Sequence, residues 1–164
     1  MIKPLFQRIV VGYNGSRSSL HTVLYAILMA KVYKCAVKVV SVVDTASIKY
    51  LTQKFMVSQE GESIAKSLES DSEKNLDYVT DLAKSKGVKI ETEIRKGAVW
   101  AEIITAADEF KADLILLGGA KNLDHLSSLS RDVISSQDSE IIGSAHCSVM
   151  VVREPYVEQK FKLV

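Results

Sequence analysis

The chain has 164 residues, of which 47% are hydrophobic and 25% are charged, a composition typical of one folded globular domain. Its 21 lysine and arginine residues nearly balance its 20 acidic residues, so the formal net charge is only +1. Because there is no basic surplus, no block of like charge and no long apolar stretch, we expect neither a nucleic-acid-binding protein nor a membrane-bound one.

The start of the chain and its two cysteines predict a cytoplasmic location. The apolar run at residues 9–11 is too short for a secretory signal or a membrane-spanning helix. Cys35 and Cys147 fit a reducing compartment, and neither belongs to a C-x-x-C motif. The three histidines form no metal-binding cluster with them, so we expect no metal site.

The chain begins with a predicted strand, a helix and a second strand. Residues 8–12 are a short apolar run typical of a buried strand, and the turn dipeptide Asn14-Gly15 follows it. Apolar residues then recur at three- and four-residue spacing, which predicts an amphipathic helix ending near Lys34. The apolar run at residues 37–43 predicts the second strand.

Residues 44–86 divide into an irregular part and a regular part. Residues 44–61 lack a clear period, and we expect a long loop or an irregular helical segment there. The composition of residues 62–86 predicts a helix, and Gly87 fits its C-cap position. We expect the inner face of this helix to consist of Ile64, Leu68, Leu76, Val79 and Leu82.

The second half of the chain continues the alternation of strands and helices. Residues 88–94 alternate apolar and polar side chains, as expected for a strand with one exposed face at a sheet edge. Residues 118–134 are a polar, serine-rich loop. The other predicted elements are a helix over 99–110, a buried strand over 112–117, a short helix over 135–144 and a last strand over 148–152.

This order of elements predicts an α/β fold in which helices cover both faces of a parallel sheet. Ligands bind such sheets outside the carboxyl ends of the strands, at the point where the strand order reverses. Two segments meet that description, residues 13–16 after the first strand and residues 118–136 after the fourth. We therefore expect the functional site between these two segments.

Four segments, in order along nearly the whole chain, resemble motifs of the universal stress protein family. They are IVVGYNGS at 9–16, like the opening strand and its V-D-G-S turn, RKGAVWAEII at 95–104, like G-x-x-x-x-x-I, ADLILLG at 112–118, like A-D-L-I-V-M-G, and AHCSVMVVR at 145–153, like A-P-C-P-V-L-V-V-R. The resemblance implies a Rossmann-like, five-stranded parallel sheet with strand order 3-2-1-4-5. It also implies one such domain over residues 1–155, followed by a C-terminal tail over 156–164.

The ATP-binding branch of that family implies a phosphate site that this chain keeps only in part. After the fourth strand that branch has G-x-x-G, then nine residues, then G-S or G-T, whose amides and hydroxyl approach the phosphates. Here Gly118 matches the first glycine, Lys121 replaces the second, and Ser135-Ser136 replaces the G-S pair after thirteen residues. The charge of the lysine could attract a phosphate in place of the missing glycine.

The adenine end of the implied pocket is altered as well. Asn14, followed by Gly15, stands where the family has an aspartate beside the adenine, and Val42 lies near the same place. Ser135 and Asp138 match an [ST]-x-x-[DE] capping box, which would satisfy the free amides of the helix and add a negative charge where a phosphate would lie. These residues form a degenerate nucleotide pocket, in which we expect no tightly held ATP and no other cofactor.

The last strand predicts how the chain assembles. In the implied strand order it lies at the sheet edge, where unpaired amides are an aggregation hazard unless another segment covers them. In the resembling family two copies of this strand meet antiparallel about a twofold axis, which implies a homodimer. The alternative cover is the tail, residues 156–164, folded back on the sheet. The strand residues that would form the dimer are Val149, Met150, Val151 and Val152.

The resemblance implies a non-catalytic stress-response or regulatory protein that acts as a homodimer, with a further protein partner that the sequence does not identify. No Ser-His-Asp, Cys-His or paired-carboxylate arrangement is evident, so we predict no enzyme. The alternative is an ATP-binding member that hydrolyses ATP slowly or phosphorylates itself in the serine-rich loop. A third interpretation, a flavin or electron-carrier domain, is disfavoured because no hydroxyl-rich phosphate loop is evident after the first strand.

Overall fold

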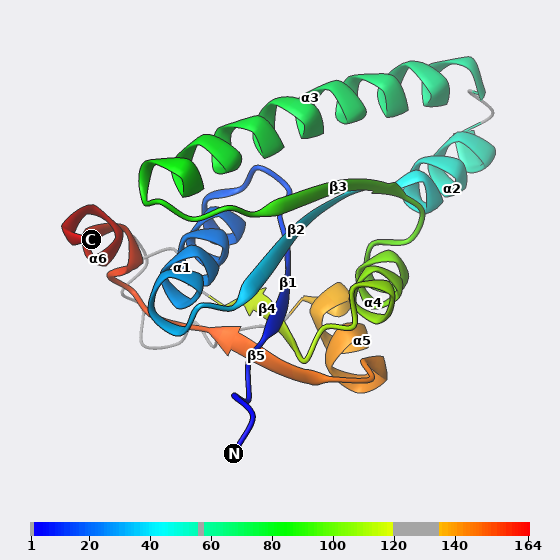
Figure 1. Ribbon diagram of the computed structural model, residues 1–164. Coiled ribbons are helices and arrows are strands. Elements are labelled where there is room, and N and C mark those ends of the chain that lie inside the picture. Colours follow the sequence, from blue (N-terminus) through cyan, green and yellow to red (C-terminus); the bar gives the residue numbers. More distant parts are fainter. Residues whose placement is uncertain (1, 56–57, 120–134) are drawn as a thin grey trace, which may run out of the picture.

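The computed structural model describes residues 2–55, 58–119 and 135–164 of the chain (Figure 1). Five parallel strands form one sheet in the order β3-β2-β1-β4-β5, which confirms the predicted α/β class and strand order. The elements are β1 (Arg8–Gly12), α1 (Arg17–Tyr33), β2 (Ala36–Val43), α2 (Thr45–Phe55), α3 (Ser58–Ser85), β3 (Glu91–Lys96), α4 (Val99–Phe110), β4 (Leu114–Gly118), α5 (Ser136–Ser144), β5 (Ser148–Val152) and α6 (Val157–Leu163).

Successive residues of β1 divide the core into two layers. Ile9 and Val11 are fully buried against α1, α3 and α6 on one face of the sheet. Val10, between them, is fully buried against α4 and α5 on the other face. This division follows from strand geometry, because neighbouring side chains of a strand point to opposite faces. A central parallel strand is therefore apolar throughout, as its sequence predicts.

Residues 45–55, in the segment without a clear period, form the regular helix α2. Asp44 starts this helix, because its carboxylate accepts hydrogen bonds from the backbone N–H (3.0 Å) and the hydroxyl (2.7 Å) of Ser47. The loop prediction is therefore wrong, and the helical alternative was nearer. The cap at Asp44 was the available sequence signal for a helix start, and periodicity alone did not reveal it.

The end of α3 confirms the predicted C-cap and delays the next strand. Gly87 has a φ of 70°, and its N–H donates to the carbonyl of Lys84 (2.9 Å), while the Val88 N–H donates to the carbonyl of Ala83 (2.9 Å). This pair of bonds is a Schellman motif. Because Val88 is held by the helix end, β3 begins only at Glu91, three residues later than predicted.

Only the C-terminal part of the predicted inner face of α3 is buried. Leu76 and Val79 are buried and Leu82 is half-buried, but Ile64 and Leu68 expose 47% and 40% of their surface. Figure 1 shows the reason, because the N-terminal part of the 28-residue α3 extends beyond the sheet. The prediction for Ile64 and Leu68 is therefore wrong, since periodicity gives the face of a helix but not which part of it meets the core.

The tail residues form α6, which folds back onto α1. Val157 and Phe161 are buried in the same core layer as α1. The carboxylate of Glu158 lies 2.8 Å from Nε2 of His21 on α1, which ties the two helices together. Among the described residues, β5 pairs with β4 alone. The tail thus packs on α1 and does not run along the outer edge of β5.

The two cysteines do not form a disulfide with each other. Cys35 and Cys147 are free thiols at the starts of β2 and β5, with β1 and β4 between them. Burial raises the pKa of both thiols.

Of the helices in the described ranges, none is both long and apolar enough to cross a membrane. Nor do three or more histidine, cysteine or acidic side chains gather there as a metal site would require.

Candidate functional site

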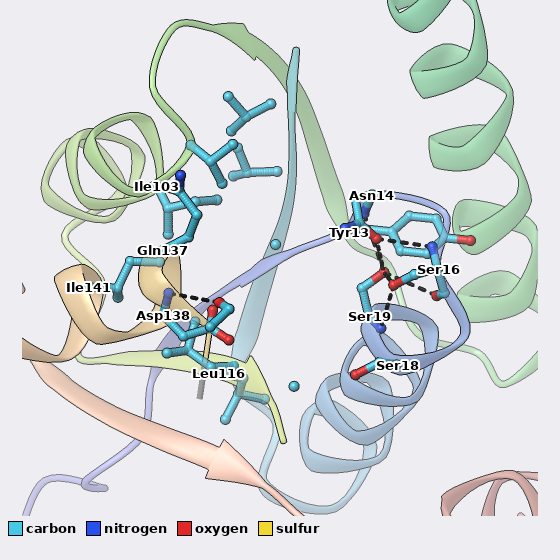
Figure 2. Close-up of a pocket in the computed structure, with 17 residues that line it drawn as sticks. Tyr13, Asn14, Ser16, Ser18, Ser19, Ile103, Leu116, Gln137, Asp138 and Ile141 are labelled. Atoms are coloured by element: carbon cyan, nitrogen blue, oxygen red, sulfur yellow. Dashed lines mark hydrogen bonds between the residues drawn. The ribbon is translucent and has the colours of Figure 1, made fainter. Parts of the chain in front are cut away.

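A cleft of about 380 Å³ opens at the carboxyl ends of β1 and β4, where the strand order reverses (Figure 2). Residues at or near the starts of α1, α4 and α5 line this cleft. The described lining consists of Gly12, Tyr13, Asn14, Ser16, Ser18, Ser19, Val40, Val42, Val99, Ile103, Leu116, Leu117, Gly118, Ser135, Gln137, Asp138 and Ile141.

The turn after β1 and the first turn of α1 form a polar wall. Oδ1 of Asn14 accepts hydrogen bonds from the Ser16 N–H (3.0 Å) and from the Ser19 hydroxyl (2.8 Å). The Ser16 hydroxyl donates to Oγ of Ser19 (2.9 Å) and accepts from the Ser19 N–H (3.2 Å), so it caps α1. Figure 2 shows this closed network beside the cleft. Asn14 therefore has a structural role in the turn, whatever the ligand.

The two glycines of the predicted pocket have packing reasons of their own. Gly15 has a φ of 82°, and a Cβ there would lie 2.6 Å from Nδ2 of Asn75 on α3. A Cβ on Gly118 would lie 2.9 Å from the hydroxyl oxygens of both Ser18 and Thr22. Because residue 118 is a glycine, the end of β4 can lie this close to α1 without displacing those side chains. Both glycines are explained by the fold without reference to a phosphate.

Apolar side chains dominate the rest of the lining. Figure 2 shows Ile103 of α4 and Ile141 of α5 on the side opposite the polar wall. Val42 of β2 contributes to the apolar lining. Oε1 of Gln137 accepts a hydrogen bond from the Trp100 N–H (3.1 Å), which joins the first turns of α4 and α5. The cleft thus has an apolar surface suited to a flat ring and a hydroxyl-bearing wall suited to polar groups.

The start of α5 carries the predicted cap. Oγ of Ser135 accepts a hydrogen bond from the Asp138 N–H (3.1 Å), so one free amide of the helix is satisfied by the chain itself. Figure 2 shows this bond at the side of the cleft. The carboxyl group of Asp138 also lines the cleft. Burial raises its pKa, although its hydrogen bond with Ser135 acts in the opposite direction.

The described lining contains no lysine, arginine, histidine or cysteine. Its ionisable groups are Asp138 and Tyr13. Burial raises the pKa of the Tyr13 phenol, and the nearby Tyr78 adds to that effect. Within the described residues the cleft therefore offers hydroxyls, amide groups and apolar surface, but no positive charge that could neutralise a phosphate.

The cleft brings together four of the seven residues predicted for the nucleotide pocket. Gly15 lies in the turn beside the polar wall, and Ser136 is the exposed first residue of α5, but neither lines the cleft. Lys121 lies outside the described residues. The four residues that line the cleft are Asn14, Val42, Gly118 and Ser135.

Sequence reasoning missed the hydroxyl groups that follow β1. Ser16, Ser18 and Ser19 all line the cleft, and the sequence S-R-S-S directly after Gly15 was their signal. Ser16 caps α1 and Ser18 and Ser19 lie in its first turn, so these hydroxyls belong to the helix start, and the absence of a hydroxyl-rich phosphate loop stays a prediction. Two of these hydroxyls bond to each other and one of them to Asn14, so they already serve the turn and the helix cap.

The predicted dimer strand is β5, at the edge of the sheet next to β4. Val149, Met150 and Val151 are half-buried, and Val152 is buried. The outer edge of this strand has no strand partner in the described part of the chain. Three half-buried apolar side chains therefore lie on an edge that can accept another strand.

Known proteins are similar to this chain in sequence and in fold. The chain matches the universal stress protein family over residues 5–153. Universal stress protein MJ0531 of Methanocaldococcus jannaschii is 32% identical over 154 residues, which cover 94% of this chain and 86% of that protein. The solved structure of universal stress protein UspA from Lactobacillus plantarum is similar with a TM-score of 0.69 and 17% identity, over 90% of this chain and 98% of that chain.

A second solved structure is the universal stress protein from Archaeoglobus fulgidus in complex with dAMP. It is similar with a TM-score of 0.59 and 16% identity, over 92% of this chain and 100% of that chain. At these identities the two solved structures establish the likeness of the fold. The family match, in contrast, extends from the residues before β1 to the end of β5 and includes both segments that flank the cleft. On the strength of that match and of the 32% identical relative, this chain belongs to the universal stress protein family.

Proposed function

We propose that this chain is a non-catalytic, cytoplasmic regulatory member of its family, which acts in the stress response as a homodimer and does not hold ATP tightly. The observation that carries the ATP part of this proposal is the start of α5. There Ser135 occupies the Asp138 N–H, and the Asp138 carboxyl group lines the cleft. A helix N-terminus attracts phosphate through free amides, and a carboxylate among them opposes a phosphate.

The start of α1 supports the same conclusion. Ser16 caps that helix as Ser135 caps α5, so two of the helix N-termini at the cleft already have an amide bound by their own serine. A triphosphate carries several negative charges that a tight site must neutralise. The described lining supplies none of the lysine or arginine side chains that would do so.

The lining also supports a non-catalytic role. Nucleophilic catalysis needs a hydroxyl or thiol with a base in hydrogen-bond reach. The cleft has serine hydroxyls, but its described lining contains no histidine or lysine to serve as the base, and the serine beside its one carboxyl group, Ser135 next to Asp138, already caps α5. Two of those hydroxyls, on Ser16 and Ser19, are engaged in the polar wall. We therefore assign the cleft to binding and not to turnover.

A compact ligand, such as a nucleoside monophosphate, is the second candidate for this cleft. The volume of about 380 Å³ lies near the lower end of the range for small-molecule pockets, about 300–1,000 Å³. The apolar surface around Ile103 and Val42 suits a base, and the polar wall suits a sugar. The solved structure of the universal stress protein from Archaeoglobus fulgidus is a complex with dAMP, which is itself a nucleoside monophosphate.

Mass spectrometry of the denatured, freshly purified protein and thermal unfolding with added nucleotide would test both candidates. We expect no copurified ATP and no shift with millimolar Mg-ATP. A ligand at 100 times its Kd stabilises a protein by about 2.7 kcal/mol, which raises the Tm at this size by roughly 5–10 °C. A clear shift with ATP would contradict the proposal and favour the ATP-binding alternative, with slow hydrolysis or autophosphorylation.

Asp138→Asn separates the effect of charge from that of the cap. We expect this variant to gain nucleotide affinity, because the carboxylate opposes phosphate, while the backbone cap at Ser135 remains. Glu140→Gln is the matched control, since Glu140 is exposed on the same helix and does not line the cleft. Equal behaviour of the two variants would remove the carboxyl group from the explanation.

A further inference from the structure

The helices α2 and α3 form a pair that projects from the body of the molecule. In Figure 1 α2 and the first part of α3 lie beyond the end of the sheet. The two helices contact each other closely. Gly61 of α3 is buried, and a Cβ there would lie 2.7 Å from Cγ2 of Thr52 on α2. The α2–α3 pair is therefore a packed unit with its own contact seam.

The α2–α3 pair exposes several large apolar side chains. α2 has 11 residues and buries none of them in this chain. Leu51 and Phe55 lie one helical turn apart on α2, and Ile64 and Leu68 lie one turn apart on α3, so each helix presents an apolar pair on one face. A gathering of large exposed apolar side chains marks an interaction site. Together with Tyr50 they form the pair surface, whose members expose between 40% and 65% of their area, namely Tyr50, Leu51, Phe55, Ile64 and Leu68.

The two helices of the pair carry opposite charges, because α2 is basic and the first part of α3 is acidic. α2 carries Lys49 and Lys54 and no acidic residue. The first sixteen residues of α3, 58–73, carry five acidic residues and one lysine. Within the described residues no ion pair joins α2 to α3, and the ammonium group of Lys54 lies over the Tyr50 ring, 5.9 Å from its centre. On α3, Glu69 pairs with Lys96 of β3 (2.9 Å), and within the described ranges the other acidic side chains of residues 58–73 form no ion pair.

We propose that the pair surface docks on the pair surface of a second copy of this chain, with α2 of each copy against α3 of the other. A twofold axis places the same patch of both copies in contact, so every contact occurs twice. In this arrangement the basic α2 faces the acidic α3, and the apolar pairs of both helices meet between them. The chain supplies both complementary halves, which is what an isologous contact requires.

The charges favour a second copy over a membrane. Residues 45–73 carry three lysines against five acidic residues, and this negative balance opposes binding to an anionic lipid surface. The contact is also small, since it involves few helical turns. Small interfaces, below about 1,200 Å², are weak or transient. We therefore expect this association to appear only at high protein concentration, and to act independently of any contact through β5.

A charge exchange tests the proposal. One variant carries Lys49→Glu and Lys54→Glu, and the other carries Glu60→Lys, Glu62→Lys and Asp71→Lys; all five side chains are exposed. In either variant alone α2 and α3 carry like charge, so the docked copies should repel each other. In an equimolar mixture each α2 again meets an α3 of opposite charge. Sedimentation velocity over a wide concentration range should show association in the wild type, its loss in each variant, and its return in the mixture.

Two further arms keep the result decisive. Met150→Lys on β5 is added to the wild type and to both charge variants, so that no strand contact contributes. With Met150→Lys alone the protein should still form dimers through the pair surface. With Met150→Lys added to either charge variant it should be a monomer. Lys84→Glu with Lys89→Glu is the control, since both lysines are exposed outside the pair surface. Circular dichroism checks that each variant folds.

Three results would overturn the proposal. The first is a wild-type mass that the charge variants leave unchanged, which would assign the pair surface to a different protein. The second is a mixture that fails to regain association. The third is binding of the wild type to phosphatidylserine vesicles, abolished by Leu51→Ser with Phe55→Ser, which would assign the surface to a membrane. None of these results depends on whether the cleft binds a nucleotide.

Discussion

β3 and β5 both end the sheet, and in the described residues each has one edge without a strand partner, but their side chains differ. β3 carries four charged residues among six, whereas β5, with the sequence SVMVV, carries none. Charged side chains on an edge strand hinder the addition of another strand, and apolar ones invite it. The comparison indicates that β3 is built to remain an edge, whereas β5 needs a cover, as the proposed homodimer would provide.

The charges of β3 form a network that ties the strand to α4. The side chain of Arg95 is 16% exposed and lies 2.7 Å from a carboxylate oxygen of Glu102, 2.7 Å from Glu93 and 2.9 Å from Glu109. Lys38 of β2 lies 2.8 Å from Glu93. The hydrogen bond to Glu102, followed by those to Glu109 and Glu93, holds the pKa of Arg95 above its ordinary value, despite burial. Arg95 thus contacts all three carboxylates, and Lys38 shares one of them.

The largest effect is expected for Arg95→Ala. This change leaves three carboxylates close together without their common cation, two of them with only 26% of the side chain exposed. Removing one partner of a buried charge pair costs about 3 kcal/mol or more, whereas an exposed pair contributes less than about 1 kcal/mol, so we expect about 2 kcal/mol for this half-buried network, which lowers the Tm at this size by roughly 4–8 °C. Thermal unfolding followed by circular dichroism measures it. Lys89→Ala, at an exposed position before β3, is the control, and an equal Tm for the two variants would show that the network stabilises little.

A change of intermediate size is expected for β5. Met150→Lys places a charge on the apolar edge, so we expect light scattering to give a monomer where the wild type is a dimer, measured at concentrations too low for the α2–α3 contact. At ten times the Kd, dimerisation stabilises the fold by about 1.4 kcal/mol. Leu163→Lys, at an exposed position on α6, should keep the dimer. A monomeric wild type at these concentrations would contradict the proposed strand contact.

The pattern of apolar runs predicted most of the fold because parallel strands and their helices are decided by local periodicity. The helix at 99–110 and the strands at 8–12 and 148–152 have the predicted bounds. The family resemblance supplied the strand order. The errors lie where a single contact outweighs the pattern, as at Asp44, whose side chain starts α2. At Val88 the helix end holds the backbone and delays β3.

The site was predictable in position but not in detail. Motif comparison located Asn14, Gly118 and Ser135 at the cleft. It could not reveal that the Asn14 side chain accepts hydrogen bonds from two serines, or that the Gln137 side chain accepts one from the backbone N–H of Trp100. Such contacts depend on how the turns and helices meet in space. The packing reason for Gly118 likewise appears only once β4 lies against α1.

The smallest effect is expected at acidic pH and concerns Glu93. Burial alone would raise the pKa of Glu93, but Lys38 and Arg95 outweigh burial, and its pKa lies below the ordinary value. Because the folded-state pKa is the lower one, the ionised carboxylate stabilises the fold at neutral pH. That contribution begins to disappear as the pH falls below the ordinary carboxyl pKa, and it is lost as the pH passes through the folded-state value.

Glu93→Gln should therefore cost about 1 kcal/mol at neutral pH, and the difference from the wild type should shrink on acidification. Urea unfolding at a series of pH values measures it. Glu91→Gln is the control, because Glu91 is exposed on the same strand and forms no ion pair within the described residues; it should follow the wild type throughout. A difference in the free energy of unfolding between Glu93→Gln and the wild type that stayed constant at all pH values would contradict this prediction. The effect would then come from packing, and the difference between the charged edge β3 and the apolar edge β5 would not depend on the ionised Glu93.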